Sequence, residues 1–281
     1  MPDTPLANSS SSFRNLDDLW TVISVAMLAF IVADIAHEAF GHILGFYLAG
    51  GQSGLATTTR LIVWVTLGDP QWRIFDLGGP AGNLIFALLA WLAQRFVRTR
   101  PLPLKLFLWL LMAFSLFWAF GYLIFSGVLG RGDWMALITG TRFVWPGRVL
   151  FVVLGIVLYR ASIRLAASEL RWLIHIRDAN DRARLVRLIW ISYISGGVIA
   201  CAGAILDPRG PFEILNSGAL SSFAGGIGLL YVPRNLFRMA QLPGEANNPI
   251  SRDLPWLIAA AAGAIYYVGI LGPGILIWLG K

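Results

Sequence analysis

The sequence has little charge: only 13% of its 281 residues are Asp, Glu, Lys or Arg, whereas 57% are hydrophobic. Soluble domains usually carry about 25% charged and about 45–50% apolar residues. A water-soluble fold of this length would need that charge for its surface, which excludes an ordinary soluble enzyme. The apolar excess also excludes intrinsic disorder. Cys201 is the single cysteine, so there is no intramolecular disulfide framework and no metal site made of cysteines alone.

The charge that is present is mostly positive, with a formal net charge of +7. The basic residues lie in short connections between apolar runs, a pattern typical of membrane topology, and we expect no nucleic-acid partner. If the chain has seven spans and an inner N-terminus, 15 of the 22 basic residues lie on the inner side. This distribution favours a cytoplasmic N-terminus. We therefore expect a multi-pass integral protein of the cell membrane, with the lipid bilayer as a partner.

The apolar runs are candidates for membrane-spanning helices, which need about 20 mostly apolar residues each. Six charge-free runs lie at 19–33, 77–94, 106–130, 188–206, 214–233 and 254–280, and a further span begins near Val149 and ends around Arg160 or Arg164. The run 214–233 is rich in Gly and Ser and predicts either a tightly packed span or a re-entrant segment. The expected fold class is an all-α polytopic membrane protein with six or seven transmembrane helices.

The connection after the first span differs from the others. It is β-branched over 57–67 and is bounded by a Gly-Asp-Pro turn at 68–70, so we expect a strand or hairpin at the membrane surface. The chain then divides into a polar N-terminal tail at 1–18, a membrane core at 19–140, and additional transmembrane helices of unknown role at 141–281.

Four ionisable residues interrupt the first apolar run: Asp34, His37, Glu38 and His42. Each ionisable group at membrane depth costs at least about 2.5 kcal/mol, and such groups usually mark a functional site. Two imidazoles and an adjacent carboxylate are the groups that a catalytic zinc centre uses, with the histidines as ligands and the glutamate as general base. The alternative is a helix end at the interface, with structural, hydrogen-bonded histidines.

The histidines are five residues apart, His-Glu-x-x-x-His, whereas the usual zinc motif places them four apart. At 100° per residue, an ideal helix would put His42 about 140° away from His37. A one-residue π-bulge, or unwinding at Gly41, would bring both imidazoles to one face. A third ligand must come from elsewhere, and both Asp133 and Asp76 are candidates, because up–down–up threading brings them to the same membrane face as the histidines.

Together, these residues resemble the site-2 protease family of intramembrane zinc metalloproteases over roughly residues 19–140. The likeness rests on the histidine–glutamate cluster, on the Gly-Pro-Ala-Gly-Asn sequence at 79–83, and on Asp133 after the following helix. The β-branched stretch 57–67 lies where these proteases carry a membrane-associated sheet. The resemblance thus makes 19–140 a metalloprotease-like core.

The resemblance implies one zinc ion held by His37, His42 and Asp133, with Glu38 as the general base. It implies that Asn83 binds the substrate strand or the developing oxyanion. Asp34, one turn before His37, is a candidate either to orient a ligand imidazole from behind or to serve structural helix packing. The expected function is a zinc-dependent endopeptidase that cleaves a membrane-embedded or membrane-proximal peptide. The alternative is a non-catalytic membrane protein: a transporter, a metal-binding scaffold or an inactive protease relative.

Overall fold

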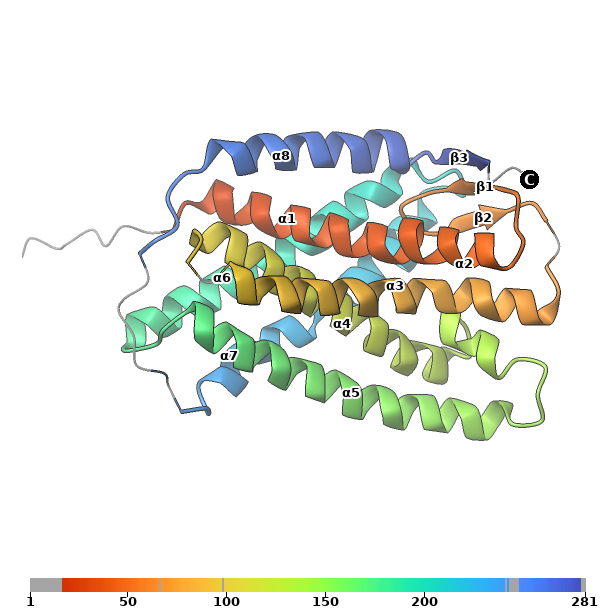
Figure 1. The fold of residues 1–281 in the computed structure, drawn as a ribbon, viewed down its shortest axis with the longest axis horizontal. Helices are drawn as coiled ribbons and strands as arrows, with labels where there is room; N and C mark the ends of the chain where they lie inside the picture. The colour runs from red at the N-terminus through yellow and green to blue at the C-terminus, as the bar shows by residue number, and fades with distance from the viewer. Residues whose placement is uncertain (1–16, 66, 98, 241, 243–247, 279–281) are drawn as a thin grey trace, which may run out of the picture.

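The computed structural model describes residues 17–65, 67–97, 99–240, 242 and 248–278, and it forms a bundle of long helices with a small sheet near one end (Figure 1). Most of the expected N-terminal tail, residues 1–16, lies outside the described residues. Seven helical segments of the described chain are long and apolar enough to cross a membrane. The upper of the two expected counts is therefore confirmed, and the fold fits a multi-pass membrane protein.

The first three spans build the part of the bundle that carries the ionisable cluster. The first span comprises α1 (Leu19–Ile35), the π-helix η1 (Ala36–His42) and α2 (Ile43–Leu48). The next two are α3 (Asp69–Phe96) and α4 (Leu102–Leu129), and the short 3-10 helix η2 (Asp133–Leu137) follows. Asp18 caps α1 by accepting a hydrogen bond from the Thr21 amide, and the left-handed Gly130 ends α4.

The later spans complete one bundle with the first three. They are α5 (Val144–Leu173), α6 (Ala179–Gly203) with the 3-10 turn η3 (Ala204–Leu206), the π-helix η4 (Ile214–Ala224) with α7 (Gly228–Leu236), and α8 (Leu254–Ala264) with the π-helix η5 (Ile265–Leu271). α1 packs against α6 and α8, and α4 packs against α5. The Gly- and Ser-rich run therefore belongs to a helical segment of spanning length, Ile214–Leu236.

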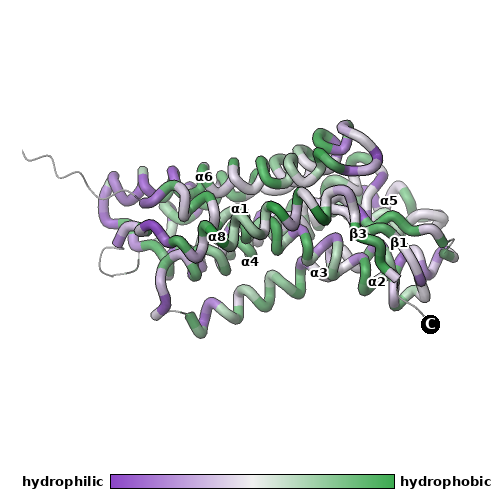
Figure 2. Tube along the Cα trace, turned by 90° about the horizontal axis from the view of Figure 1, so that it is seen from above, coloured by the Kyte–Doolittle hydropathy of each residue, from purple (hydrophilic) through white to green (hydrophobic). Residues whose placement is uncertain are grey.

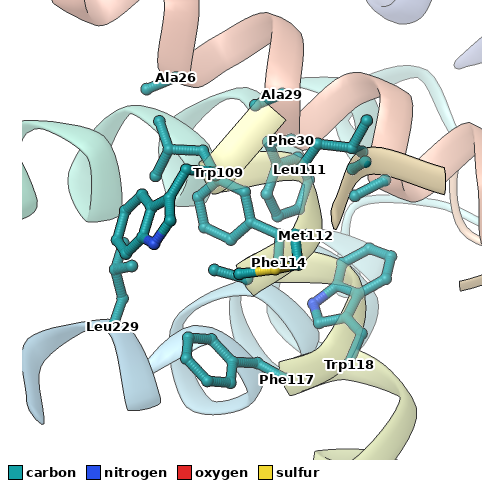
Figure 3. Close-up of a cluster of buried hydrophobic side chains, with 14 of the residues drawn as sticks. Ala26, Ala29, Phe30, Trp109, Leu111, Met112, Phe114, Phe117, Trp118 and Leu229 are labelled. Carbon is teal, nitrogen blue, oxygen red and sulfur yellow. The ribbon is translucent and has the colours of Figure 1, made fainter. Parts of the chain in front are cut away.

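Aromatic side chains of α4 fill the centre of the bundle (Figure 3). Trp109 and Phe117 are fully buried, and the Phe30 ring of α1 meets Phe114 edge to face at 5.6 Å between ring centres. Large apolar side chains also cover the outside of α5, including Val149, Leu150, Val153 and Val157. A helix that is apolar on its outer face is suited to lipid. Figure 2 shows hydrophobic residues along the middle of the helices and hydrophilic ones toward the ends.

The small sheet confirms the β element expected after the first span and adds a strand that the sequence did not predict. β1 (Ser53–Ala56) lies between β2 (Leu61–Val63) and β3 (Ile275–Trp278), and both pairings are antiparallel. The last span was expected to run to residue 280, but its helix ends at Leu271. Proline at 273 and Gly274, whose φ is +104°, turn the chain back into the sheet.

Candidate metal centre

The extra residue between the two histidines is accommodated by the π-helix η1, which spans Ala36–His42. The wider π turn places both imidazoles on one side, with their ring centres 5.0 Å apart. Both rings are buried, with exposed fractions of 3% for His37 and 5% for His42. The predicted π-bulge is therefore present, and the five-residue spacing is compatible with a shared ligand.

Glycines bring α3 against this π-helix. A Cβ atom on Gly41 would clash with the backbone of Gly78, and one on Gly82 would clash with the Ala36 carbonyl. These close approaches need residues without side chains. This contact between α3 and η1 brings residues 75–83 around the histidines, although they lie more than thirty positions further along the chain.

Three ligand atoms converge between these helices and η2. Asp133 Oδ2 lies 3.0 Å from His37 Nε2 and 3.7 Å from His42 Nε2, and one ligand atom from each residue lies within 4.8 Å of the other two. A tetrahedral zinc site with bonds of about 2.0–2.2 Å places its ligand atoms about 3.3–3.6 Å apart. The observed separations bracket that edge length, so these three residues fit one zinc ion.

The hydrogen bonds behind the imidazoles set their tautomers. Asn83 donates through its amide nitrogen to the Ala33 carbonyl at 2.9 Å, so its Oδ1 accepts from His37 Nδ1 at 2.8 Å. His42 Nδ1 donates to the Phe75 carbonyl at 3.0 Å. Each Nε2 atom then carries a free lone pair directed toward Asp133 Oδ2, which is buried and has no hydrogen-bond donor among the described residues. Three electron-pair donors facing one another repel unless a cation or a proton lies between them, so the arrangement could hold a metal ion.

Gly79 forms the remaining wall of this space. A Cβ atom at this position would lie 2.6 Å from His37 Nε2 and 2.6 Å from His42 Nε2. Any side chain here would therefore occupy the volume that faces both ligand nitrogens. The glycine of the Gly-Pro sequence keeps room for a cation.

No family model, curated protein or solved structure matches this chain. The likeness to site-2 proteases therefore rests on the sequence motifs alone.

The two candidate third ligands are placed differently. Among the described residues, His37, His42 and Asp133 form the one group of three potential ligands that meets the distance requirement. Gly132, with a φ of +97°, starts the η2 turn that carries Asp133 back toward the histidines. Asp76 lies in the wall of the adjoining cavity and outside this group. The geometry thus favours Asp133 as the ligand.

Glu38 lies beside the cluster with a carboxylate that the protein leaves unsatisfied. Its Oε2 is buried and has no hydrogen-bond partner among the described residues. Glu38 lines a cavity of about 630 Å³ together with His42 and Asp133. A buried carboxylate oxygen without a donor costs free energy unless it serves a ligand. This position is suited to a base that acts on a molecule in the cavity.

Two residues assigned from the sequence have other surroundings in the structure. Asn83 was expected to bind substrate, but its side chain is fully buried and joins His37 to the Ala33 carbonyl. Its place is therefore behind a ligand, and it does not appear in the cavity wall. For Asp34 the sequence left imidazole orientation and helix packing open, and in the structure its side chain hydrogen-bonds with Tyr267 of η5.

The cavity wall combines a strand expected from the sequence with residues of the later half of the chain that the sequence did not predict. β2 forms one side through Leu61, Ile62 and Val63, and the later half of the chain adds Arg209, Asn216 and Ser217. A smaller adjoining cavity of about 30 Å³ reaches from Glu38 to Ser221 and Tyr267. No periodicity or motif marks Arg209, Asn216 and Ser217, because they reach the site only through packing of the later part of the chain on the first span. The helices after residue 140 therefore help to build the site.

Proposed function

We propose that this chain is a zinc-dependent intramembrane endopeptidase that cleaves a membrane-embedded or membrane-proximal peptide. The observation that carries the proposal is the convergence of His37, His42 and Asp133 beside the unsatisfied carboxylate of Glu38. The placement of this cluster within a membrane-spanning helix supports the assignment, because ionisable groups at that depth usually serve a function.

His37, His42 and Asp133 would hold a zinc ion, which would supply Lewis acidity and lower the pKa of a water molecule to about 7. Proton transfer and the positioning of the ligands depend on the chain's own residues. Glu38 accepts a proton from the attacking water and donates it to the leaving amine. Asn83 and the Phe75 carbonyl hold the imidazoles with their Nε2 atoms toward the ligand space.

The sheet supports a peptide as the substrate. β2 is an edge strand in the order β2-β1-β3, and its residues line the cavity that contains Glu38. A peptide in a bilayer must unwind before it is cut, and its freed backbone groups then need partners. The open edge of β2 offers them by strand addition. This arrangement favours an extended peptide over a small solute.

The proposal is tested with Glu38→Gln in purified protein reconstituted in liposomes with dye-labelled single-span peptides as the probe. Loss of a general acid–base group lowers a rate typically by about 10²–10⁴-fold. We expect both the wild type and Glu38→Gln to contain about one zinc ion per chain. Mass spectrometry should detect peptide fragments with the wild type alone. Cleavage by Glu38→Gln at the wild-type rate would refute the role of Glu38.

Metal content separates the ligand candidates in the same preparation. Asp133→Asn should lose zinc, whereas its matched control Asp76→Asn should retain it. Wild-type protein that never binds zinc would contradict the proposal and would favour a His37 imidazolium paired with Asp133. Bound zinc without cleavage of any peptide would favour the non-catalytic metal-binding alternative.

A further inference from the structure

Four arginines line one pocket of the bundle that contains no residue of the metal centre. Arg160 and Arg164 lie one turn apart on α5, while Arg234 lies on α7 and Arg238 follows it by four residues. The pocket has a volume of about 230 Å³, and its other lining residues are Ile163, Tyr231 and Asn235. No acidic side chain lines it, so it gathers four positive charges.

The four pocket arginines differ from other arginines of the chain that have acidic partners. Elsewhere toward this end of the bundle, Arg95 pairs with Glu169 at 2.7 Å and Arg184 pairs with Asp17 at 2.6 Å. Within the described part of the chain, none of the four pocket arginines has an ion pair or a side-chain hydrogen bond. Like charges held close together repel one another unless an anion lies between them.

An apolar cleft adjoins the basic pocket. It has a volume of about 410 Å³ and shares Arg234 and Arg238 with the pocket. Its remaining lining comes from α6, α7 and the residue after α7, namely Val186, Ile189, Trp190, Leu230, Pro233 and Phe237. A cationic pocket and an apolar cleft that share two residues match a molecule with an anionic head and a hydrocarbon tail.

The depth of the arginines agrees with a position at one membrane boundary. Arg160 and Arg164 follow Val144, where α5 begins, by 16 and 20 residues. At 1.5 Å per residue they lie about 24 and 30 Å along the helix. The hydrocarbon core of a bilayer is about 30 Å thick. α5 begins just after η2, which carries Asp133, so the arginines mark the boundary opposite the metal centre.

We propose that the pocket and the cleft together bind one anionic phospholipid of the surrounding membrane. The phosphate accepts hydrogen bonds from the four guanidinium groups, and an acyl chain lies along Trp190 and Phe237. Basic pockets between transmembrane helices are suited to anionic headgroups. The cleft selects a lipid over a free phosphate, because a soluble anion would leave its apolar wall uncovered.

The test measures lipid adducts on the intact protein by native mass spectrometry, using dioleoyl phosphatidylglycerol and dioleoyl phosphatidylcholine as probes. We expect the wild type to retain phosphatidylglycerol in preference to phosphatidylcholine. In Arg234→Gln/Arg238→Gln, the affinity for phosphatidylglycerol should fall roughly 25-fold, because each arginine near a headgroup contributes a factor of about five. Trp190→Ala, at an exposed position, should weaken binding of the dioleoyl lipid more than that of a dihexanoyl analogue.

The matched control is Arg100→Gln/Arg252→Gln, which removes the same charge from two exposed arginines toward the same end of the bundle and outside both cavities. This control should bind phosphatidylglycerol as the wild type does. Equal affinity for the two lipids, an unchanged affinity in Arg234→Gln/Arg238→Gln, or an equal loss in the control would overturn the proposal. Complete displacement of the lipid by excess inorganic phosphate would overturn the assignment to a lipid. Neither cavity contains a residue of the metal centre, so failure here would be distinct from failure of the peptidase proposal.

Discussion

Replacing Asn83 by alanine tests whether this residue positions a metal ligand or contacts substrate. In the structure its Oδ1 accepts the hydrogen bond from His37 Nδ1 at 2.8 Å, and its side chain is fully buried. Alanine removes the acceptor and leaves the Nδ1–H group of His37 buried without a partner. The imidazole then loses the bond that fixes both its tautomer and its direction.

The expected size of the effect follows from these contacts. Removing a hydrogen-bond partner behind a ligating histidine typically weakens metal binding by about 10–100-fold. The buried N–H group left without an acceptor costs about 1–3 kcal/mol of folding stability. Both losses arise at His37, so we expect zinc affinity and thermal stability to fall together in Asn83→Ala.

The control separates loss of zinc from general destabilisation. Gln94 is another buried amide on α3, eleven residues beyond Asn83, and it contacts Ala90 and Met112. At 1.5 Å per residue it lies about 16 Å from Asn83. Gln94→Ala should lower the melting temperature while leaving zinc affinity within about twofold, because neither histidine touches it.

The assay is a chelator competition on detergent-solubilised protein, with zinc counted by elemental mass spectrometry. If Asn83→Ala binds zinc as tightly as Gln94→Ala does, the positioning role is wrong. Unchanged zinc affinity together with a selective rise in the KM for a cleaved peptide would instead favour the substrate-binding role implied by the resemblance.

Two further predictions concern the metal centre, and a third concerns the buried Asp207. Gly79→Ala should abolish zinc binding, because its Cβ would lie 2.6 Å from both ligand nitrogens, whereas Gly269→Ala, where nothing lies within 4 Å, should retain it in the same elemental analysis. Deleting Ala39 restores a four-residue spacing of the histidines, so the zinc affinity measured by chelator competition should stay within about tenfold of the wild-type value. Inserting an alanine after Ala39 should abolish zinc binding. Burial raises the pKa of Asp207, but hydrogen bonds from Arg209 and Thr59 lower it below the ordinary 3.8. Its stabilisation is therefore complete above about pH 4 and is lost as the pH falls through the folded pKa, so Asp207→Asn should flatten the acid side of the melting-temperature profile.

The sequence was sufficient for the features that depend on local pattern. Apolar runs predicted the spans, since each run had to match the thickness of a bilayer. The unusual histidine spacing predicted a helix defect, because two ligands five residues apart cannot share a face of an ideal helix. The π-helix at Ala36–His42 is that defect.

Features that depend on tertiary packing could not be predicted from the sequence. The role of Asn83 is set by the approach of α3 to η1, which brings its amide to His37. The partner of Asp34 is Tyr267, more than two hundred residues away. β3 joins the sheet because the chain turns at Gly274, and an apolar strand in that position resembles the end of a membrane span in composition.

The charge balance of the centre argues that a cation belongs to the fold as well as to the chemistry. Asp34, Glu38 and Asp133 each keep a buried carboxylate oxygen that has no hydrogen-bond partner among the described residues. Asn83 and the Phe75 carbonyl accept hydrogen bonds from the two Nδ1 atoms, so neutral imidazoles present unprotonated Nε2 atoms beside Asp133. Buried anions without partners are strongly destabilising, and a divalent ion held by His37, His42 and Asp133 would offset two charges at once. Because such an ion would bind the folded chain, its binding free energy would also stabilise the packing of α3 and η2 on the first span.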